Sequence, residues 1–553
     1  MTLPSSLEIA QAATLRPVAE IAGELGLEST EYDLYGPYKA KIHTSVLDRL
    51  QGEADAKLIC VTAITPTKAG EGKTTTSVSL TQGLGHIGKK PMLCLREASL
   101  GPVFGIKGGA CGGGYAQVVP MEDLNLHFTG DIHAIGAANN LLAAILEAHV
   151  LQGNKLGIDP LSITWRRCVD MNDRALRDIV VGLGGRANGY VRESGFDITA
   201  ASEVMAIVAV SRDLFDLRRR LGEITVGRTY EGEPVTAEQL RAAGAMTVVL
   251  KDALNPNLVQ TLEGQPALIH CGPFANIAHG NNSLIADRVG LKLRDYVVTE
   301  SGFGSDMGME KFMNIVCRVG ELTPSAVVLV ATVRALKHHG DDPDGGIDAI
   351  ERGSANLRRH LEIVRSFGLP AVVAVNRFAG DTGEELDAVK RLALEYGAHS
   401  AEVNDAFERG GEGAAALAEA VVGAADQPSD FTQTYALDAP ISTKIGAIAT
   451  RIYGATEVHF LPPAEASMAR FTADGLDRLP VCMAKTHLSL SDDPSLLNAP
   501  EDFTLHIRDI RAYTGAGWLV PLCGEIMTMP GLGEKAAAFD VDIDERGRTV
   551  GLF

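Results

Sequence analysis

The sequence has few aromatic residues and a deficit of positive charge. Aromatic side chains make up 5% of its 553 residues, and only two of them are tryptophans, Trp165 and Trp518. The formal net charge is -20. A polyanion would therefore be repelled by the chain as a whole, and few rings are available to stack on unpaired bases. These features exclude nucleic acid as the main partner, while a local basic pocket for a small anion stays open.

Clustered cysteines, an export signal and long apolar runs are also missing. The eight cysteines contain no CxxC pair, which argues against a disulfide framework and indicates free thiols in a reducing compartment. The N-terminal segment has its first basic residue only at Arg16 and no apolar stretch of signal-peptide length. The longest apolar runs, such as residues 326–331, fall far below the roughly 18 residues of a membrane span. We therefore expect a cytoplasmic protein with no membrane partner.

Short β-branched and apolar runs alternate with segments rich in alanine and leucine. With 46% apolar and 22% charged residues, the chain has the composition of a folded globular protein. The alternation predicts an α/β fold with a largely parallel sheet, whose ligands bind at the carboxyl ends of the strands. Buried strands are predicted at residues 57–64, 91–95, 246–250, 325–330 and 370–375.

Glycine- and proline-rich stretches suggest how the chain divides into domains. At about 150 residues per domain, a chain of this length has three to four of them. We expect a nucleotide-binding α/β core at residues 1–340 and a second α/β domain at residues 341–470, which would carry the aromatic residues of the site. A small mixed domain is expected at residues 471–553. The first boundary coincides with the stretch GDDPDGG at residues 340–346.

A glycine-rich loop follows the first predicted strand. Gly72, Lys73 and Thr74 form the GK[ST] end of a P-loop, whereas Thr67 replaces its first glycine, so the stretch fits the variant KxGxGK[ST]. In such a loop, backbone N–H groups and the start of the next helix bind phosphates, and Thr74 can ligate Mg²⁺. The core is therefore predicted to be P-loop NTPase-like, the alternative being a chance turn before a helix. The residues expected to bind nucleotide are Thr67, Lys68, Ala69, Gly70, Glu71, Gly72, Lys73, Thr74 and Thr75.

Arg96 and Glu97 follow the second predicted strand. A right-handed crossover makes this strand parallel to the first, so both residues should lie at the same sheet edge as the phosphate loop. An arginine there can hold a phosphate or carboxylate oxygen through two hydrogen bonds. The alternative is an ordinary surface pair of arginine and glutamate.

The stretch from residue 96 to residue 131 resembles formate tetrahydrofolate ligase, also called 10-formyltetrahydrofolate synthetase. One family signature reads GIKGGACGGGY at residues 105–115, with Cys111 where alanine is expected, and another reads ASEVMAI at residues 201–207. The resemblance extends from the phosphate loop to the end of the chain. Further matching segments lie at residues 165–177, 258–280, 300–312, 330–337, 481–494 and 528–532.

This resemblance implies ATP-dependent ligation of formate to tetrahydrofolate, giving 10-formyltetrahydrofolate, ADP and phosphate. Formate is a poor electrophile and the aryl amine N10 is a weak nucleophile, so formate must first be activated. The family implies formyl phosphate as the activated intermediate. It also implies Mg²⁺, a monovalent cation (K⁺ or NH₄⁺) as activator, and a homotetramer.

The resemblance assigns catalytic roles to three side chains. Lys73 and Arg96 would stabilise the transferred phosphoryl group and formyl phosphate, and a well-placed arginine can contribute roughly 10³ to 10⁵ in rate. Glu97 would orient Arg96. Glycines after this pair would let the backbone approach the intermediate closely, the alternative being a merely flexible loop. The glycines concerned are Gly108, Gly109 and Gly112.

Two aromatic residues are expected to stack on the pterin ring of the folate. Phe378 follows a predicted strand where the family places such a ring, and Phe407 stands where the family often has tryptophan. The alternative for Phe378 is a packing role. With phenylalanine at 407, stacking should survive with a smaller overlap area. Asn281 replaces the family's usual cysteine after IAHG, without an expected catalytic consequence.

Other candidates are weaker. His127 and His133 lack a third ligand at a zinc spacing, and the run of arginines at residues 218–220 is typical of a solvated helix face, although it could reach a polyglutamate tail. The competing functional class is a partition-type ATPase that uses the same loop to control dimerisation. Such a switch needs neither the glycine-rich anion loop nor its neighbouring arginine. Another ligase that forms an acyl phosphate is the third alternative.

Overall fold

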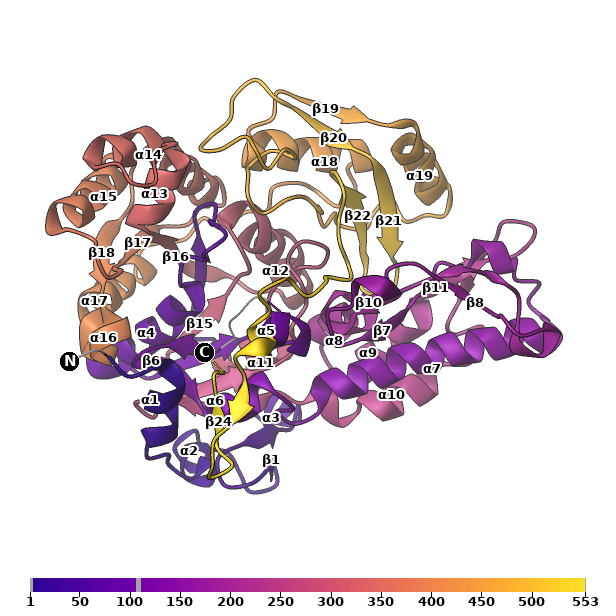
Figure 1. The fold of residues 1–553 in the computed structure, drawn as a ribbon, viewed down its shortest axis with the longest axis horizontal. Helices are drawn as coiled ribbons and strands as arrows, with labels where there is room; N and C mark the ends of the chain where they lie inside the picture. The colour runs from indigo at the N-terminus through magenta and orange to yellow at the C-terminus, as the bar shows by residue number, and fades with distance from the viewer. Residues whose placement is uncertain (1–2, 106–110, 553) are drawn as a thin grey trace.

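The computed structural model describes residues 3–105 and 111–552. Its centre is a twelve-stranded sheet with helices packed against both faces (Figure 1). The main path of the sheet runs in the order β1-β2-β13-β14-β4-β15-β3-β16-β17-β18, and β5 and β6 are attached beside β13. The structure therefore confirms the α/β class and the large central sheet.

Seven neighbouring strands of this sheet are parallel to one another. Their carboxyl ends consequently lie at one edge, where an α/β fold places its ligands. Antiparallel strands extend the sheet beyond β14. The seven parallel strands are β14 (Pro266–Ile269), β4 (Pro91–Leu95), β15 (Tyr296–Glu300), β3 (Lys57–Ala63), β16 (Pro324–Ala331), β17 (Ala371–Asn376) and β18 (Ser400–Asn404).

The buried strands place successive side chains in two different cores. On β3, Leu58 and Cys60 belong to one hydrophobic cluster, and Ile59 and Val61 belong to the other. This is the period of two expected of a pleated strand that is covered on both faces. Such strands are almost continuously apolar, which is why they could be recognised in the sequence.

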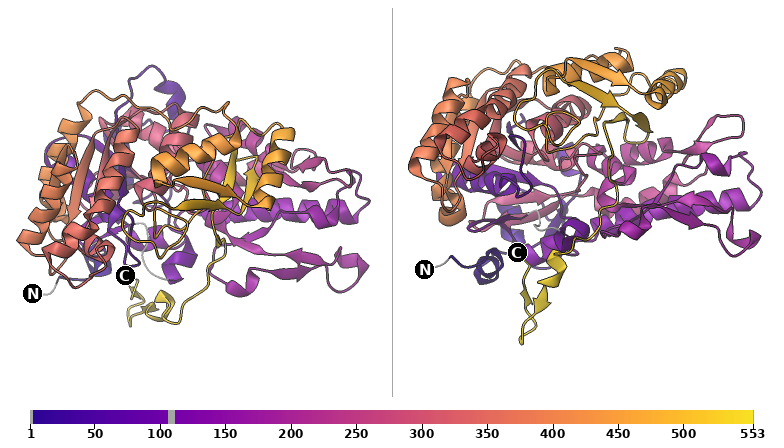
Figure 2. Two further views of the ribbon diagram at one scale, coloured as in Figure 1. Left: turned by 90° about the horizontal axis from the view of Figure 1, so that it is seen from above. Right: turned by 45° about the horizontal axis from the view of Figure 1, so that its top comes forward.

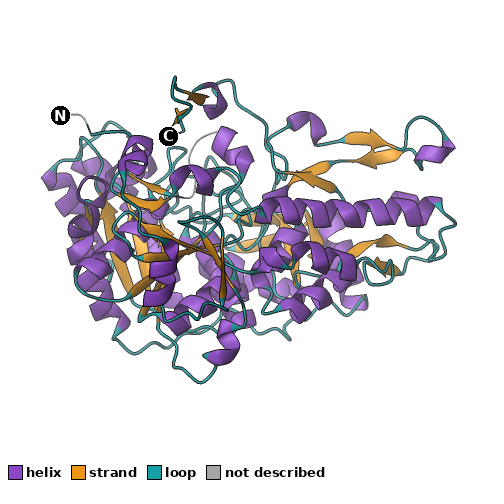
Figure 3. Ribbon diagram, turned by 90° about the horizontal axis from the view of Figure 1, so that it is seen from below, coloured by secondary structure: helices purple, strands orange, loops and turns teal. Residues whose placement is uncertain are grey.

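Each core is closed by its own set of helices, best seen in Figures 2 and 3. Helices α4 (Lys73–His86) and α17 (Ala415–Ala425) contact each other and contribute to one cluster. On the opposite face lie α11 (Leu284–Leu293), α13 (Val333–His339) and α14 (Ile347–Ser366). The sheet is thus the middle layer of three.

Four of the five predicted strands are confirmed as β3, β4, β16 and β17. The fifth prediction was wrong, because Met246–Leu250 lies in helix α10 (Ala243–Leu250). In that helix Met246 and Leu250 are buried, four residues apart, whereas Val248 is 75% exposed. The spacing is helical, and five apolar residues are too few to separate a strand from a buried helix turn by composition.

An elongated arm projects from the sheet domain, at the right of Figure 1. It is built on α7 (Asp131–Leu151), which contacts α10 and β7 (Arg167–Val169). By length and composition α7 could cross a membrane, with a mean hydropathy of 1.4. Its Glu147 nevertheless forms ion pairs with Arg192 and Arg167, and one helix of this kind also fits the core of a folded domain. The expectation of no membrane partner stays a prediction.

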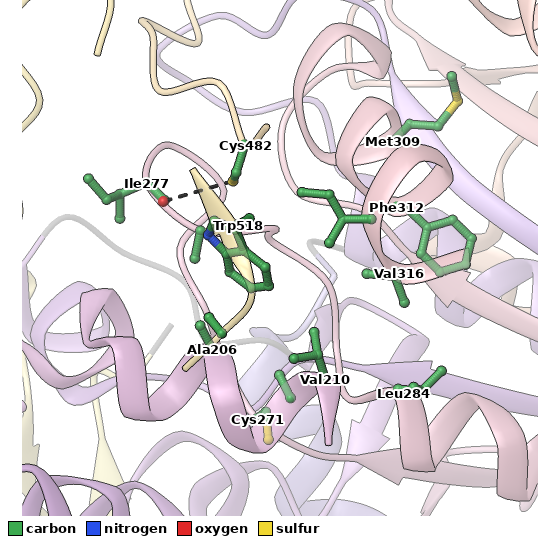
Figure 4. Close-up of a cluster of buried hydrophobic side chains, with 14 of the residues drawn as sticks. Ala206, Val210, Cys271, Ile277, Leu284, Met309, Phe312, Val316, Cys482 and Trp518 are labelled. Atoms are coloured by element: carbon green, nitrogen blue, oxygen red, sulfur yellow. Dashed lines mark hydrogen bonds between the residues drawn. The ribbon is translucent and has the colours of Figure 1, made fainter. Parts of the chain in front are cut away.

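The C-terminal part forms smaller sheets beside the arm and the main sheet. It contains α18 (Ile441–Ile448), α19 (Pro462–Ala473), four strands of four or five residues, and a short hairpin of β23 (Asp542–Ile543) and β24 (Thr549–Val550). Trp518 of β22 is fully buried between segments from distant parts of the chain, including Ala206, Val210 and Phe312 (Figure 4). The strands are β19 (Glu457–Phe460), β20 (Thr504–Ile507), β21 (Asp509–Tyr513) and β22 (Trp518–Leu522).

The main sheet continues past the first predicted domain boundary. Strands β17 and β18, which follow residue 340, pair in parallel with β16 and extend the same sheet. The chain end also returns to its beginning, because the Gln11 side chain donates to the Thr549 carbonyl over 3.0 Å. The division at residues 340 and 470 stays a prediction.

Candidate active site

The predicted phosphate loop connects β3 to α4 at the carboxyl edge of the sheet. Gly70 and Gly72 have φ angles of 75° and 74°, a conformation that favours glycine. A side chain at Gly72 would also lie 2.9 Å from the Asn376 amide nitrogen. That amide donates to the carbonyls of Glu71 and Gly72, so the end of β17 holds the loop against the start of α4.

Glu71 points into the protein, away from the open side of the loop. Its carboxylate accepts hydrogen bonds from the backbone and hydroxyl of Thr67, both 2.7 Å, and from the Thr332 hydroxyl at 2.6 Å. Burial acts to raise the pKa of Glu71, but these hydrogen bonds and the charge of Arg334 outweigh it, so the pKa lies below its ordinary value. Glu71 therefore fixes the shape of the loop. Lys68 and Ala69 form its exposed tip.

Lys73 and Thr74 begin α4 and lie beside Glu300, the last residue of β15. The Thr74 hydroxyl donates to the Glu300 carboxylate over 2.7 Å. Burial lowers the pKa of Lys73, Glu300 and Glu71 counteract this, and Arg96 adds to the lowering. A cation, a hydroxyl and a carboxylate thus meet at the first turn of α4. Thr75 follows on the same turn and is half-buried.

Arg96 lies at the same sheet edge, as predicted from the crossover. Strands β3 and β4 are parallel, but β15 lies between them. The Arg96 guanidinium is 3.5 Å from the Glu300 carboxylate and donates to the Pro273 carbonyl at 3.4 Å. Its buried Nε has no hydrogen-bond partner in the part of the chain that the structure describes. Glu300 therefore connects Arg96 to Thr74, and much of the guanidinium is free to bind an anion.

Glu97 is buried near charged groups that do not belong to the phosphate loop. Burial raises its pKa well above the ordinary value, and Asp131 raises it further while Lys41 opposes the shift. Asp131 and Lys41 form a buried ion pair of 2.7 Å. One Glu97 oxygen lacks a hydrogen-bond partner among the described residues. The carboxylate that contacts Arg96 is that of Glu300. The Glu97 backbone N–H donates to the Cys271 carbonyl at 2.7 Å.

The predicted glycine run is described only in its second half. Gly108 and Gly109 lie outside the described residues, whereas Gly112 is in β5 (Gly112–Gly113) with a φ of 82°. A side chain at Gly112 would be 2.3 Å from the Ala116 carbonyl, and one at Gly114 would be 2.1 Å from the Phe407 carbonyl. Glycine is required at both positions because another part of the backbone lies too close to leave room for a side chain.

The two predicted stacking residues follow adjacent parallel strands. Phe378 comes after β17 and Phe407 after β18. The Arg334 guanidinium covers the Phe378 ring at 3.9 Å from its centre. Phe407 lies against Gly113 and Gly114 and is 44% exposed. Both rings are therefore at the carboxyl edge of the sheet, one beside the phosphate loop and the other beside the glycine run.

The weaker candidates are not brought together into a site. Among the described residues, no group of three histidine, cysteine or acidic side chains is placed to hold a metal ion. Arg218 pairs with Glu238, and Arg219 and Arg220 both pair with Asp216. Arg218 and Arg219 are exposed, as expected of a solvated helix face, whereas Arg220 is buried and donates to the Ala516 carbonyl at 2.9 Å. All eight cysteines are free and buried.

A large cleft lies elsewhere, between the arm and the C-terminal strands. It has a volume of about 1380 Å³ and is lined by residues that include Arg166, Asp197, Arg511 and Tyr513. None of the predicted site residues in the described part of the chain lines it. Charged groups within it pair with each other, as Arg166 does with Asp178 at 2.8 Å. We therefore place the candidate site at the edge of the main sheet.

Comparison with known proteins identifies the family. The family model for formate–tetrahydrofolate ligase matches residues 4–553. This chain belongs to the formate–tetrahydrofolate ligase family. It is 57% identical to the formate–tetrahydrofolate ligase of Desulforamulus reducens and 53% identical to that of Saccharopolyspora erythraea, and in both comparisons 100% of each protein is covered. The chain is accordingly an enzyme, and the resemblance seen in the sequence is confirmed.

Membership of the formate–tetrahydrofolate ligase family draws attention to residues that sequence reasoning missed. Glu300 stands at the start of the matching segment ESGFGSDMGMEKF, and Arg334 lies in VATVRALK. Neither was assigned a role, although each contacts the phosphate loop or its helix. The available signal for Glu300 was a charged residue at the carboxyl end of a buried strand, since the four residues before it in β15 carry no charge.

Proposed function

We propose that this enzyme uses ATP to join formate to N10 of tetrahydrofolate, with 10-formyltetrahydrofolate, ADP and phosphate as products. One observation carries the proposal: Thr74 and Arg96 converge on Glu300 beside Lys73, at the carboxyl edge of a parallel sheet. A phosphate loop next to a partly free arginine suits transfer of a phosphoryl group to a small carboxylate. Family membership supports formate as that carboxylate.

In the first step, a formate oxygen attacks the γ-phosphorus of ATP. The new bond gives formyl phosphate, and the bond to ADP breaks with its electron pair on the ADP oxygen. Negative charge accumulates on the equatorial oxygens, and catalysis depends on positioning and on charge stabilisation. Lys73 and Arg96 would supply two positive charges, and the loop amides from Thr67 to Thr75 would hold the β- and γ-phosphates. Glu97 would support Arg96 from the buried side through its backbone bond to Cys271.

In the second step, the N10 lone pair attacks the formyl carbon. The carbon–oxygen bond to phosphate breaks with its electron pair on the phosphate oxygen, and the leaving phosphate takes up the proton that N10 loses. Arg96 would remain on the departing phosphate, so one guanidinium would serve both halves of the reaction. Gly112, in the described part of the glycine run, would let the backbone approach the intermediate closely.

The residues present fit a magnesium ion. Mg²⁺ prefers oxygen ligands and usually combines one or two protein groups with substrate phosphates and water. The Thr74 hydroxyl and the Glu300 carboxylate, 2.7 Å apart, are such a pair of oxygens. When bound, the ion would neutralise phosphate charge. Thr74 would hold it, with Glu300 either as a second ligand or as the acceptor that orients the hydroxyl.

For the folate, we propose that the pterin ring stacks on Phe378 and Phe407. The two rings follow neighbouring strands, and offset stacking of aromatic rings contributes about 0.5 to 1.5 kcal/mol beyond the area that it buries. From the same family resemblance we propose a cytoplasmic homotetramer that K⁺ or NH₄⁺ activates. Sedimentation and a comparison of potassium with sodium buffers would test the last two points.

The first experiment measures the methenyl product by its absorbance at acid pH. The protein is incubated with MgATP, formate and tetrahydrofolate, and each is omitted in turn. We expect product only when all three are present, and we expect it to be lost in Lys73→Ala and Arg96→Ala variants that keep the wild-type circular dichroism. ATP hydrolysis that needs neither formate nor folate would overturn the proposal in favour of a nucleotide switch. Product from another carboxylate instead of formate would indicate a different ligase.

A further inference from the structure

A segment of the C-terminal part reaches the candidate site. It covers residues 481–491 and lies beside β22. Its Lys485 is fully buried and forms an ion pair of 2.8 Å with Asp306, which belongs to the helical turn Ser305–Met309. That turn follows β15, the strand that ends at Glu300. The ion pair therefore fixes the segment to the chain that continues from Glu300.

His487 of this segment stacks on Phe303, which lies between Glu300 and the helical turn. The two ring centres are 4.2 Å apart, and the ring planes are inclined by 20°. Phe303 has a φ of 58°, which is uncommon for a bulky residue. Stacking uses a face of the imidazole and leaves its two nitrogens free, because they lie at the ring edge. In the part of the chain that the structure describes, these nitrogens have no hydrogen-bond partner.

The charged groups that act on His487 come from three elements. They are Lys485 of its own segment, Lys73 at the start of α4, and Asp306 of the helical turn. Burial, Lys485 and Lys73 together lower the pKa of His487 to about 4, and Asp306 opposes the shift. The ring is consequently uncharged at neutral pH. Since the charge of Lys73 acts on His487, the charge of phosphates bound at Lys73 should act on it as well.

Bound phosphates would act in the opposite direction from the two lysines. Nearby negative charge favours the charged form of a histidine. A ring with free edge nitrogens can accept a proton without losing an existing hydrogen bond, and in the charged form both nitrogens are donors. The same change thus supplies a positive charge and hydrogen-bond donors for an anion.

We propose that His487 belongs to the phosphate-binding site and takes up a proton from solvent when nucleotide binds. Its positive charge is then present with the phosphates and absent from the empty enzyme. The inference rests on the proposed function, because it takes ATP as the ligand of the phosphate loop. The only bond that forms is the new N–H bond on the ring.

Proton uptake makes nucleotide binding depend on pH. Affinity rises as the pH falls, by at most about tenfold per pH unit for one proton. The effect is confined to the window between the pKa of about 4 in the free enzyme and the higher pKa in the complex. Above that window the ring is neutral in both states.

The test is titration calorimetry without turnover. The β,γ-imido analogue of ATP is titrated with excess Mg²⁺ into the enzyme at pH 6, in two buffers of different ionisation enthalpy. The difference between the two binding enthalpies gives the number of protons exchanged. The wild type should take up more protons than His487→Gln, by a fraction of a proton per site, and should bind the analogue several-fold more tightly. At pH 9 the two proteins should exchange equal numbers of protons.

The comparison isolates His487, because protons of the analogue contribute equally in both proteins. His86→Gln is the matched control, since His86 is exposed at the far end of α4, and it should match the wild type. Phe303→Leu removes the stacking surface and should also reduce the uptake, which decides the matter if His487→Gln does not fold. Equal proton numbers at pH 6 in the wild type and the variants would overturn this inference alone. A wild type that binds no nucleotide would instead contradict the proposed function.

Discussion

The hydroxyl of Thr74 donates a hydrogen bond of 2.7 Å to the carboxylate of Glu300, although the two residues are 226 positions apart. The same carboxylate lies 3.5 Å from the Arg96 guanidinium. One acidic side chain thus contacts both the proposed magnesium ligand and the proposed anion-binding arginine. Its charge should matter to both, which makes it the first target for mutation.

Glu300→Gln should lower kcat by about 10- to 100-fold and raise the Mg²⁺ concentration needed for half-maximal rate. Groups that orient metal ligands typically contribute this much, and glutamine keeps the shape while it removes the charge. Steady-state rates over a magnesium titration measure both effects. Glu321→Gln is the control, since Glu321 is exposed beyond the end of α12 (Cys317–Gly320). A wild-type magnesium curve in Glu300→Gln would contradict the role.

Phe407→Trp should lower the KM for tetrahydrofolate by about two- to tenfold, with little change in kcat. A larger ring offers more overlap to the pterin, and one stacking contact accounts for a difference of that size. Phe407 is 44% exposed, which leaves room on its outer side. Phe407→Leu is the companion variant and should raise the same KM. Equal KM values in all three proteins would remove Phe407 from the folate site.

Gly114→Ala should reduce the free energy of unfolding by more than about 2 kcal/mol. A left-handed φ alone costs an L residue about 1 to 2 kcal/mol, and the added carbon would lie 2.1 Å from the Phe407 carbonyl. Gly26→Ala is the matched control, because Gly26 has a φ of 72° and nothing within 4 Å. Urea unfolding of both variants separates the conformational cost from the steric clash. Equal losses would show that the chain near Phe407 can move aside.

His279→Phe should make the protein less sensitive to acid. Burial lowers the pKa of His279 to about 3, with Lys311 and Arg96 adding to the effect, and its ring nitrogens have no hydrogen-bond partner among the described residues. The unfolded chain therefore binds one more proton at this position between pH 6.5 and about 3. The stability that the folded protein gains by holding His279 neutral is complete above pH 6.5. It is lost as the pH falls from 6.5 to about 3.

Urea midpoints at pH 8 and pH 5 measure this difference. The wild type should lose more stability between the two values than His279→Phe, because phenylalanine fills the place beside Trp518, whose ring centre is 5.5 Å away, and does not titrate. His459→Phe, at an exposed position on β19, is the control. Equal losses in wild type and His279→Phe would show that His279 does not contribute to the acid response.

The parts of the site that are local in sequence could be predicted, and the parts that depend on pairing between distant strands could not. The phosphate loop and Arg96 each follow an apolar strand, and a general rule on crossovers placed them at one edge. The insertion of β15 between β3 and β4 is a long-range event, and it alone brings Glu300 to Thr74. Arg334 was missed for the same reason, since β16 places it beside a loop more than 260 residues earlier.

The one wrong strand prediction, at residues 246–250, concerns a short apolar run whose sequence fits a strand and a helix equally well. The apolar run at residues 246–250 has no glycine or proline beside it to mark a strand end, and its buried positions follow a helical spacing. The correctly predicted run at residues 325–330 directly follows Pro324, but it contains three β-branched side chains, the same number as residues 246–250. Tertiary packing decides such short segments.

The strand order also determines when the site can form during synthesis. Strand β3 pairs with neither of its sequence neighbours, because its partners are β15 and β16, which end at residues 300 and 331. At roughly 5 to 20 residues per second, a ribosome needs roughly 20 to 60 seconds to reach that point. From the synthesis of β3 until that of β15, the nascent chain carries the phosphate loop on a strand with both edges unpaired. A growing chain of this enzyme should therefore be a client of ribosome-associated chaperones until its last parallel strands emerge.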